Sequence, residues 1–429
     1  MSKLSTKDKE ALDYHQFPQP GKISVETTKP FKTQKDLALA YTPGVAVPCL
    51  EIEKNPEDVY KYTAKSNLVA VITNGTAVLG LGNIGALASK PVMEGKGVLF
   101  KEFSGLDSFD IEVDSENIDK FCSVVAAIAP TFGGINLEDI KAPECFEIEK
   151  RLVQELDIPV MHDDQHGTAV ISSAGIMNAC KITNKKLEDI KIVVVGAGAA
   201  AISCSRLYRH MGVKTIYMID SKGVIHSARD DLNEYKKEFM SSSPKTQEEV
   251  FDGADVVVGL SKPGSFSVDD IKLMAKNPII FTLANPTPEI FPEDAREARA
   301  DAIIATGRSD FDNQVNNVLG FPFIFRGAMD VRAKKINIQM KIAAAEALAE
   351  LTQKEVPEYL HELYGKKIVF GKEYIIPKPF DKRLVVEISS AVAKAAIESG
   401  SSTMKDFDMK AYKIELAKRV KWGDEDARA

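Results

Sequence analysis

The sequence predicts an α/β fold: an N-terminal α/β domain, then a doubly wound parallel-sheet domain of the Rossmann type with C-terminal helices. The first observation is the run KIVVVG at 191–196, which is continuous, β-branched and followed by a glycine turn and a small-residue helical pattern. The second is repetition, because apolar runs recur at 215–220, 254–261, 279–286 and 302–308. Their spacing leaves room for a crossover after each strand, as βαβ units require.

The N-terminal part predicts a smaller α/β unit. Prolines spread through 1–65 favour short helices and turns. Apolar runs at 68–73 and 77–81 flank Asn74-Gly75, a dipeptide typical of tight hairpin turns. We therefore expect a β-hairpin there.

Two long helical patterns, at 331–351 and 384–400, close the chain. The pattern of apolar runs changes after the HDDQHG segment, and the expected domain boundary is placed there. The predicted parts are an N-terminal domain over 1–160, a nucleotide-type domain over 161–390 and a helical segment over 391–429.

Composition restricts the classes of function. The chain has 429 residues, a formal net charge of −7 and a pI near 5.6, which weigh against nucleic-acid binding. Its five cysteines are odd in number and show no C-x-x-C spacing, so a reducing compartment fits. The N-terminus has no apolar leader, and no segment reaches the roughly 20 apolar residues that span a bilayer. We expect a cytoplasmic protein that binds neither membrane nor nucleic acid.

Two glycine motifs compete for a dinucleotide. A fingerprint of this kind is meaningful where it joins a buried strand to a helix and an acidic residue ends the next strand. GAGAAA, at 196–201, satisfies this, since backbone amides at the helix start can approach a pyrophosphate. The expected cofactor-binding residues there are Gly196, Gly198, Ala199, Ala201 and Asp220.

The other motif, GLGNIG at 80–85, fits less well. It follows the expected hairpin, and Pro91, Gly95 and Gly97 leave little room for a crossover helix. We interpret it as a tight structural loop that could line the active site.

The coenzyme stays open between NAD and NADP. An acidic residue such as Asp220 favours free ribose hydroxyls, whereas Lys222 could pair with a 2′-phosphate.

The HDDQH segment supports two kinds of metal site. His162 and His166 have the spacing of a zinc-binding H-E-x-x-H helix, which suggests a metallohydrolase. Asp163 stands where that motif has glutamate, and its shorter arm would reach a zinc-bound water less well. A structural role for both histidines is favoured over zinc.

The alternative is a site built from oxygen ligands. Asp163 and Asp164, together with Glu138 and Asp139, could bind a hard divalent ion such as Mg²⁺ or Mn²⁺. Solvated charges or helix caps would explain the same residues, so the spacing alone leaves both interpretations open.

Six motifs occur in order over nearly the whole chain: LALAYTPGVA (37–46), TNGTAVLGLGNIG (73–85), SKPVMEGKGVLFKEF (89–103), NLEDIKAPECF (136–146), MHDDQHGTA (161–169) and GAGAAA (196–201). This ordered set resembles the short form of malic enzyme. The resemblance implies oxidative decarboxylation of L-malate to pyruvate and carbon dioxide, with NAD or NADP and a divalent metal. It also implies a homodimer and an active site in the cleft between the two domains.

The resemblance assigns roles by matching positions. Lys96 would be the base that takes the substrate hydroxyl proton, and Tyr41 the acid that protonates the enol product. Asp163 would assist the base, and a Tyr41–Lys96 pair near a cation would shift both pKa values toward neutrality. The implied metal ligands are Glu138, Asp139 and Asp164, and the residues implied to touch substrate or nicotinamide are Asn285 and Asn317.

One position departs from the family pattern. Larger members carry an arginine that binds a substrate carboxylate where this chain has Ala77, so another group must neutralise that carboxylate. The sequence also lacks a phosphotransacetylase-like extension, which predicts a minimal two-domain enzyme. Malolactic enzyme, which forms lactate, and a noncatalytic dinucleotide sensor are the remaining alternatives.

Overall fold

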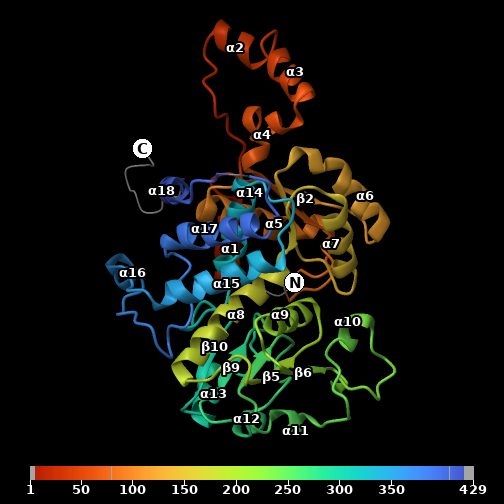
Figure 1. The fold of residues 1–429 in the computed structure, drawn as a ribbon, viewed down its shortest axis with the longest axis vertical. Helices are drawn as coiled ribbons and strands as arrows, with labels where there is room; N and C mark the ends of the chain where they lie inside the picture. The colour runs from red at the N-terminus through yellow and green to blue at the C-terminus, as the bar shows by residue number, and fades with distance from the viewer. Residues whose placement is uncertain (1–4, 79, 405, 420–429) are drawn as a thin grey trace.

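Two parallel β-sheets organise the molecule, and the computed structural model describes residues 5–78, 80–404 and 406–419 (Figure 1). The first sheet has the order β2-β1-β3-β4, and all its neighbouring strands are parallel. Its strands are β1 (Leu68–Thr73), β2 (Asp107–Glu112), β3 (Gly134–Leu137) and β4 (Val160–His162). Helices α5 (Ala86–Ser104), α6 (Ile118–Ile128) and α7 (Glu144–Glu155) connect them.

The expected hairpin after residue 73 is wrong. Strand β1 is buried along its whole length and pairs with β2 and β3, so no edge is left for a hairpin partner. Ala77, Val78, Gly80 and Leu81 instead lie in a loop, in which Val78 makes one isolated bridge with Gly82. Helix α5 starts directly after this loop and continues through Pro91, so a crossover helix does follow the first glycine motif.

The second sheet confirms the doubly wound prediction. Its order is β10-β9-β8-β5-β6-β7, parallel except for the short antiparallel edge strand β7. The order reverses between β5 and β8, which creates the crevice where such sheets bind ligands. The strands are β5 (Lys191–Val195), β6 (Thr215–Asp220), β7 (Gly223–Val224), β8 (Val256–Gly259), β9 (Ile279–Thr282) and β10 (Ile303–Thr306).

The second half of the chain also contains long and short helices. The long ones are α8 (Asp163–Thr183), α9 (Ala199–His210), α14 (Phe321–Asp330), α15 (Ile338–Gln353), α17 (Arg383–Glu398) and α18 (Met409–Arg419). The short ones are α10 (Glu234–Lys237), α11 (Gln247–Phe251), α12 (Val268–Lys272), α13 (Pro292–Ala298) and α16 (Glu358–Leu363). None of the helices in the described ranges is both long and apolar enough to cross a membrane.

The two sheets share a continuous apolar core. Helix α8 leaves the first sheet at the end of β4 and packs against α9 and α15 beside the second. From the C-terminal side, α14 returns to the first unit, where the ring of Phe100 on α5 lies edge-on to Phe321 and Phe325 at 4.8 and 5.5 Å. The expected boundary at 390 falls inside α17, so the C-terminal helices continue the same packed layer.

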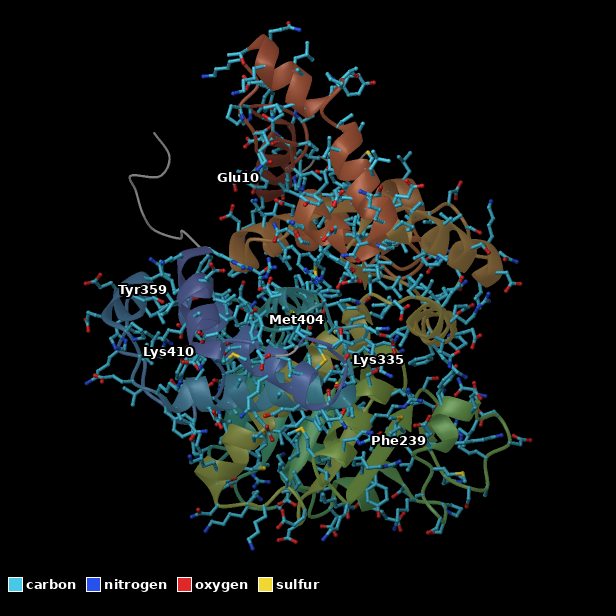
Figure 2. All side chains as sticks on the ribbon, turned by 45° about the horizontal axis from the view of Figure 1, so that its top comes forward. Glu10, Phe239, Lys335, Tyr359, Met404 and Lys410 are labelled. Carbon is cyan, nitrogen blue, oxygen red and sulfur yellow. The ribbon has the colours of Figure 1, made fainter. Side chains whose placement is uncertain are left out.

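An N-terminal arm projects from this body (Figure 1). It contains α2 (Gln34–Ala40), α3 (Ala46–Lys54) and α4 (Val59–Tyr62), whereas α1 (Thr6–Gln16) lies beside the body, and none of these four helices buries a residue. Figure 2 shows side chains spread around the projecting helices. The arm therefore lacks an apolar core within the single chain.

Candidate active site

The carboxyl edge of the first sheet gathers four carboxylates. Strands β3 and β4 are parallel and in register with Leu137 opposite His162, so the residues that follow each strand meet at one edge. Glu138 and Asp139 follow β3, while Asp163 and Asp164 form the first turn of α8.

Three of these carboxylates fit a hard divalent cation. Oxygen atoms of Glu138, Asp139 and Asp164 lie within 4.8 Å of one another, and the first two residues are buried. An all-oxygen donor set of this kind suits Mg²⁺ or Mn²⁺ rather than zinc. Burial raises the pKa of Glu138 well above its usual value, and the neighbouring carboxylates add to this increase. Bound positive charge would relieve that repulsion.

The backbone around Asp139 is shaped for this arrangement. Asp139 has φ +53°, a left-handed conformation that non-glycine residues rarely adopt. Its N–H donates to Asp164 Oδ2 at 2.8 Å, which ties the end of β3 to the start of α8. Its carbonyl accepts from the N–H of Ala77 at 2.9 Å. The loop carrying the first glycine motif therefore lies directly beside the carboxylates.

Lys96 reaches the cluster from the middle of α5. Its ammonium lies 2.8 Å from Glu138 Oε1 and donates to Asp163 Oδ2, also at 2.8 Å. It also sits over the ring of Phe321, 4.2 Å from the centroid, and its side chain is only 10% exposed. Burial alone would lower the pKa of Lys96, but the charges of Asp163 and Glu138 raise it.

The pKa of Lys96 is therefore raised, whereas the sequence analysis expected it to be lowered toward neutrality. A lysine between two carboxylates keeps its proton, because the ammonium is what they stabilise. Oδ1 of Asp163 is buried and accepts no hydrogen bond from any described residue. The geometry therefore leaves one oxygen of the cluster available to a further donor or cation.

Asn317 and Asn285 bring the second half of the chain to this edge. Asn317 donates to Asp163 Oδ2 at 3.2 Å and accepts from Thr168 Oγ1 at 3.0 Å. Asn285 follows β9, and its carbonyl oxygen would lie 3.4 Å from a Cβ placed on Gly80. The first glycine loop thus packs against the second unit, where the sequence analysis expected a loop lining the site.

Tyr41 does not join Lys96 in the single chain. It ends α2 on the projecting arm and is 69% exposed, whereas α5 lies within the body (Figure 1). The structure describes no contact between the two side chains.

The two histidines of the zinc alternative have different surroundings. His162 ends β4, and its backbone N–H donates to Glu149 Oε1 at 2.9 Å. The His166 ring pairs with the other oxygen of Glu149, also at 2.9 Å. Burial lowers the pKa of His166, so its ring stays neutral. Neither histidine belongs to a group of potential metal ligands within the described residues, which supports their structural interpretation.

The GAGAAA turn joins β5 to α9 as the sequence predicts. Gly196 has φ +132°, and a Cβ there would lie 2.4 Å from the carbonyl oxygen of Leu260. Gly198 caps α9, and a Cβ on it would meet no atom within 4 Å, which leaves open space at the helix start. Ala199 begins the helix and Ala201 is buried against the sheet. This crevice has the shape and amide donors that a pyrophosphate requires.

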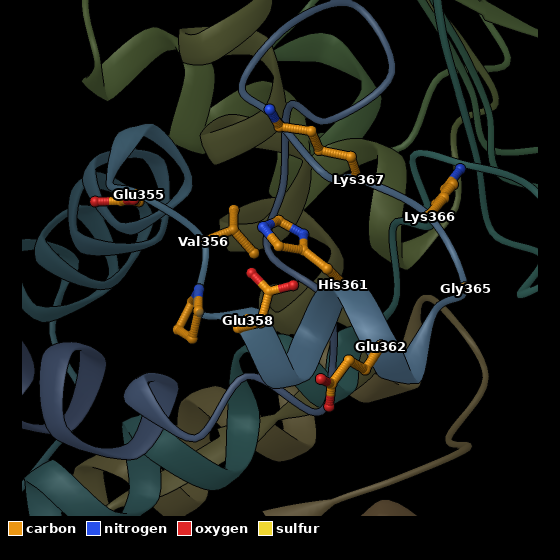
Figure 3. Close-up of a pocket in the computed structure, with 9 residues that line it drawn as sticks. Glu355, Val356, Glu358, His361, Glu362, Gly365, Lys366 and Lys367 are labelled. Atoms are coloured by element: carbon orange, nitrogen blue, oxygen red, sulfur yellow. The ribbon is translucent and has the colours of Figure 1, made fainter.

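A separate cavity lies away from these residues. It has a volume of about 960 Å³ and opens around α16 (Figure 3). Its lining residues are Glu355, Val356, Pro357, Glu358, His361, Glu362, Gly365, Lys366 and Lys367. None of them belongs to the carboxylate cluster or the glycine turn.

Sequence reasoning missed two residues that shape the site. Phe321 forms the apolar floor beneath Lys96, and Glu149 anchors the turn that carries Asp163 and Asp164. Phe321 stands only four residues after Asn317, which is a usable signal. Glu149 lies mid-helix in α7, and nothing in its local pattern distinguishes it from a solvated acidic residue.

Comparison with known proteins agrees with this architecture. The family model for the malic enzyme N-terminal domain matches residues 20–153, and that for the malic enzyme NAD binding domain matches residues 165–366. A protein from Halomonas elongata named NADP-dependent malic enzyme is 58% identical over 91% of this chain and 93% of its own length. A protein from Rhizobium meliloti named NAD-dependent malic enzyme is 52% identical over 96% of this chain and 54% of its own length.

The crystal structure of malic enzyme from Pyrococcus horikoshii superposes with a TM-score of 0.88 at 42% identity, covering 96% of this chain and 95% of that one. This chain spans about half the length of several curated relatives that it matches. The resemblance seen in the ordered motifs is confirmed, and the chain belongs to the malic enzyme family.

Proposed function

We propose that the chain oxidatively decarboxylates L-malate to pyruvate and carbon dioxide and reduces NAD or NADP. The observation that carries this proposal is Lys96, buried between Glu138 and Asp163 at the edge of a three-carboxylate group. Asn317 reaches the same region from the second unit, which also carries the GAGAAA turn at the start of α9. A hydroxy acid seated there would have a proton acceptor, a cation site and a dinucleotide crevice around it.

The protein side chains handle the protons. Lys96 takes the proton of the malate hydroxyl, and Asp163 holds the resulting ammonium through its 2.8 Å hydrogen bond. Asn317 fixes Asp163 from the other side, and Asn285 lines the approach from the dinucleotide domain. A dinucleotide bound at the GAGAAA turn would supply the hydride acceptor, and Mg²⁺ or Mn²⁺ held by Glu138, Asp139 and Asp164 would supply Lewis-acid chemistry at the substrate oxygens.

Lys96 must be neutral before it can accept a proton. Its raised pKa comes from two carboxylates, and one of them, Glu138, is also a proposed cation ligand. Charge neutralisation at Glu138 would remove one of these two contributions and lower the pKa of Lys96. The base and the cation site are therefore coupled through Glu138.

We further propose a homodimer in which Tyr41 of a second copy serves as the acid that protonates C3 of the enol. Tyr41 is exposed on an arm without a core, so a partner surface would both cover the arm and bring the phenol to a site. The other large apolar side chains exposed on this part of the arm are Leu37, Leu39, Val45, Val47 and Leu50. A cytoplasmic location is proposed as well, in keeping with five free cysteines.

The test is cofactor reduction with L-malate, measured at 340 nm with NAD and with NADP, before and after chelation of Mn²⁺, with pyruvate assayed in parallel. Metal-dependent reduction matched by pyruvate is expected. Lactate without net reduction would assign the malolactic reaction instead. Turnover that survives chelation, or the absence of both products, would refute the proposed function.

A further inference from the structure

A second cavity, of about 530 Å³, lies between the two units. Helix α7 of the first unit lines it together with α9, α10 and the start of α15 from the second. It extends to Val160 at the amino end of β4, whereas the carboxylate cluster follows the carboxyl ends of β3 and β4. None of the residues assigned above to the metal, to proton transfer or to the GAGAAA turn lines it. The proposed reaction therefore gives this cavity no role.

Lys341, in the first turn of α15, lines the cavity with an ammonium that is not yet engaged. The ammonium makes no hydrogen bond or ion pair with any residue in the described ranges. Burial lowers the pKa of Lys341 to about 8, and the carboxylate of Glu149 opposes this decrease while the charge of Arg206 adds to it. An acceptor inside the cavity would hydrogen-bond this ammonium and replace the hydration that it loses on burial.

Gln165, in the first turn of α8, supplies a second donor to the cavity wall. Its side chain is 1% exposed, and its Oε1 accepts from Ser203 Oγ at 3.4 Å. Its Nε2 is buried and donates to no residue in the part of the chain that the structure describes. Buried amide groups are normally hydrogen-bonded, so an unpaired donor on a cavity wall points to an acceptor that enters the cavity.

The carboxylates on the wall, by contrast, are occupied or exposed. Both oxygens of Glu149 are held at 2.9 Å by the turn that starts α8. Glu238 accepts from Arg206 Nε at 2.9 Å and from a second nitrogen of the same guanidinium. Glu234 is exposed on α10. The unused hydrogen-bonding groups inside the cavity are therefore donors, which fits an anion rather than a cation.

We infer that the cavity between α7, α9 and α15 is a binding site for a small anion with several acceptor oxygens, a carboxylate or phosphate compound, held by Lys341 and Gln165. Its volume is that of a metabolite site. The rings of Phe146 and Tyr235 lie 4.2 Å apart on one wall and offer apolar surface to the rest of such a ligand. The exposed Lys150 on α7 adds a further positive charge. This site is separate from the proposed malate and dinucleotide positions and does not rest on the proposed function.

The test is calorimetric titration of the full chain, after chelation of divalent metal, with inorganic phosphate and with succinate as separate probes. At least one of them should bind, and the tighter probe assigns the phosphate or the carboxylate class. Lys341→Met should weaken this binding about tenfold or more, as loss of a hydrogen bond to a charged group warrants, whereas Lys341→Arg should retain it. An anion bound at the GAGAAA turn would survive Lys341→Met, so a component that survives belongs elsewhere.

Lys335→Met is the matched control, because Lys335 is an exposed lysine just before α15 and lies outside the cavity. It should bind both probes as the unmodified protein does. Absence of binding to the unmodified protein, or equal affinities in Lys341→Met and Lys335→Met, would overturn the site while the proposed function stands.

A second measurement uses the unmodified protein, so it does not depend on the folding of any variant. Trace acetylation by acetic anhydride, mapped by mass spectrometry with and without the tighter probe, compares Lys341 with Lys335. The probe should slow acetylation of Lys341 severalfold and leave Lys335 unchanged, because a bound anion covers the Lys341 amine and holds its proton. Equal rates at Lys341 with and without the probe would overturn the site.

Discussion

The substitution Glu138→Gln should remove most of the stabilisation that bound Mn²⁺ gives to the folded protein. Glu138 is one of three carboxylates whose oxygens lie within 4.8 Å, and its neutral isostere keeps the volume while removing the charge. A ligand that binds only the folded state at 100 times its Kd adds about 2.7 kcal/mol to the free energy of unfolding. Mn²⁺ at that excess should therefore stabilise the unmodified protein by this amount.

This energy converts to a measurable shift. The chain has 429 residues, and at about 2.1 cal/mol/K per residue its unfolding entropy is about 0.9 kcal/mol/K. The Tm should therefore rise by about 3 °C with Mn²⁺ in the unmodified protein, and by less than about 1 °C in Glu138→Gln. Comparing each variant with and without metal cancels any effect of the substitution on the metal-free state.

The assay is differential scanning calorimetry after chelation, repeated at fixed pH with Mn²⁺ added. Glu112→Gln is the control, since Glu112 is a partly buried carboxylate at the end of β2 in the same sheet but lies outside the three-carboxylate group. It should retain the full metal shift. A full shift in Glu138→Gln, or no shift in the unmodified protein, would refute the assignment of these carboxylates as ligands.

Three further outcomes are expected. Burial and a neighbouring aspartate raise the pKa of Glu112 to about 7, so its protonated form stabilises the fold below its ordinary pKa and that stability is lost as pH rises through 7. After allowance for solvent screening, the free energy of unfolding of Glu112→Gln relative to the unmodified protein should therefore be about 1 kcal/mol higher at pH 8 than at pH 5. Urea unfolding at both pH values measures this difference, and the same value at both would contradict the prediction. Gly196→Ala should lower stability by about 2 kcal/mol or more because its Cβ meets a carbonyl oxygen at 2.4 Å. Gly198→Ala should instead keep the Tm and lose dinucleotide affinity in calorimetric titration, and the same effect from both substitutions would argue against open space at Gly198. Tyr41→Phe and Lys96→Ala should each be inactive alone, but mixing the two proteins with subunit exchange should restore about a quarter of the activity if Tyr41 acts in a second copy. No recovery after exchange would place Tyr41 in its own chain's site.

The second sheet was predictable because four of its strands, β5, β8, β9 and β10, are buried almost throughout. Runs such as KIVVVG are continuous in apolar β-branched residues, and the turn after β5 has a glycine that no other residue could replace without a clash. Local pattern and tertiary environment therefore agree there. The coenzyme preference was not predictable from Asp220. An acidic residue at this position suggests a contact with ribose hydroxyls, but in the structure Arg229 and Lys236 donate to its oxygens.

The first sheet shows where local signals fail. Asn74-Gly75 does begin a turn, and Gly75 has φ +68° with Gly85 packed against it, but the turn opens a long loop rather than a hairpin. Pro91 lies within α5, beyond the first turn in which proline is tolerated, and the helix nevertheless continues through it. Glycine and proline signals indicate a local turn, but they do not reveal which strands pair. The pairing of β1 with β2 and β3 is what excludes the hairpin.

The Tyr41–Lys96 pair combines both lessons. The motifs carrying these residues are the first and third of the family pattern, and sequence order does not reveal whether one chain supplies both. Lys96 is surrounded by Glu138, Asp163 and Phe321. These neighbours stabilise its ammonium form, but Tyr41, the proposed acid, is not among them. If charge neutralisation at Glu138 lowers the pKa of Lys96, the pH profile of kcat/KM should have a basic-form limb that moves to higher pH when a weaker-binding cation replaces Mn²⁺. A limb that stays at one pH with both cations would separate the base from the carboxylate group and remove Glu138 as the link between them.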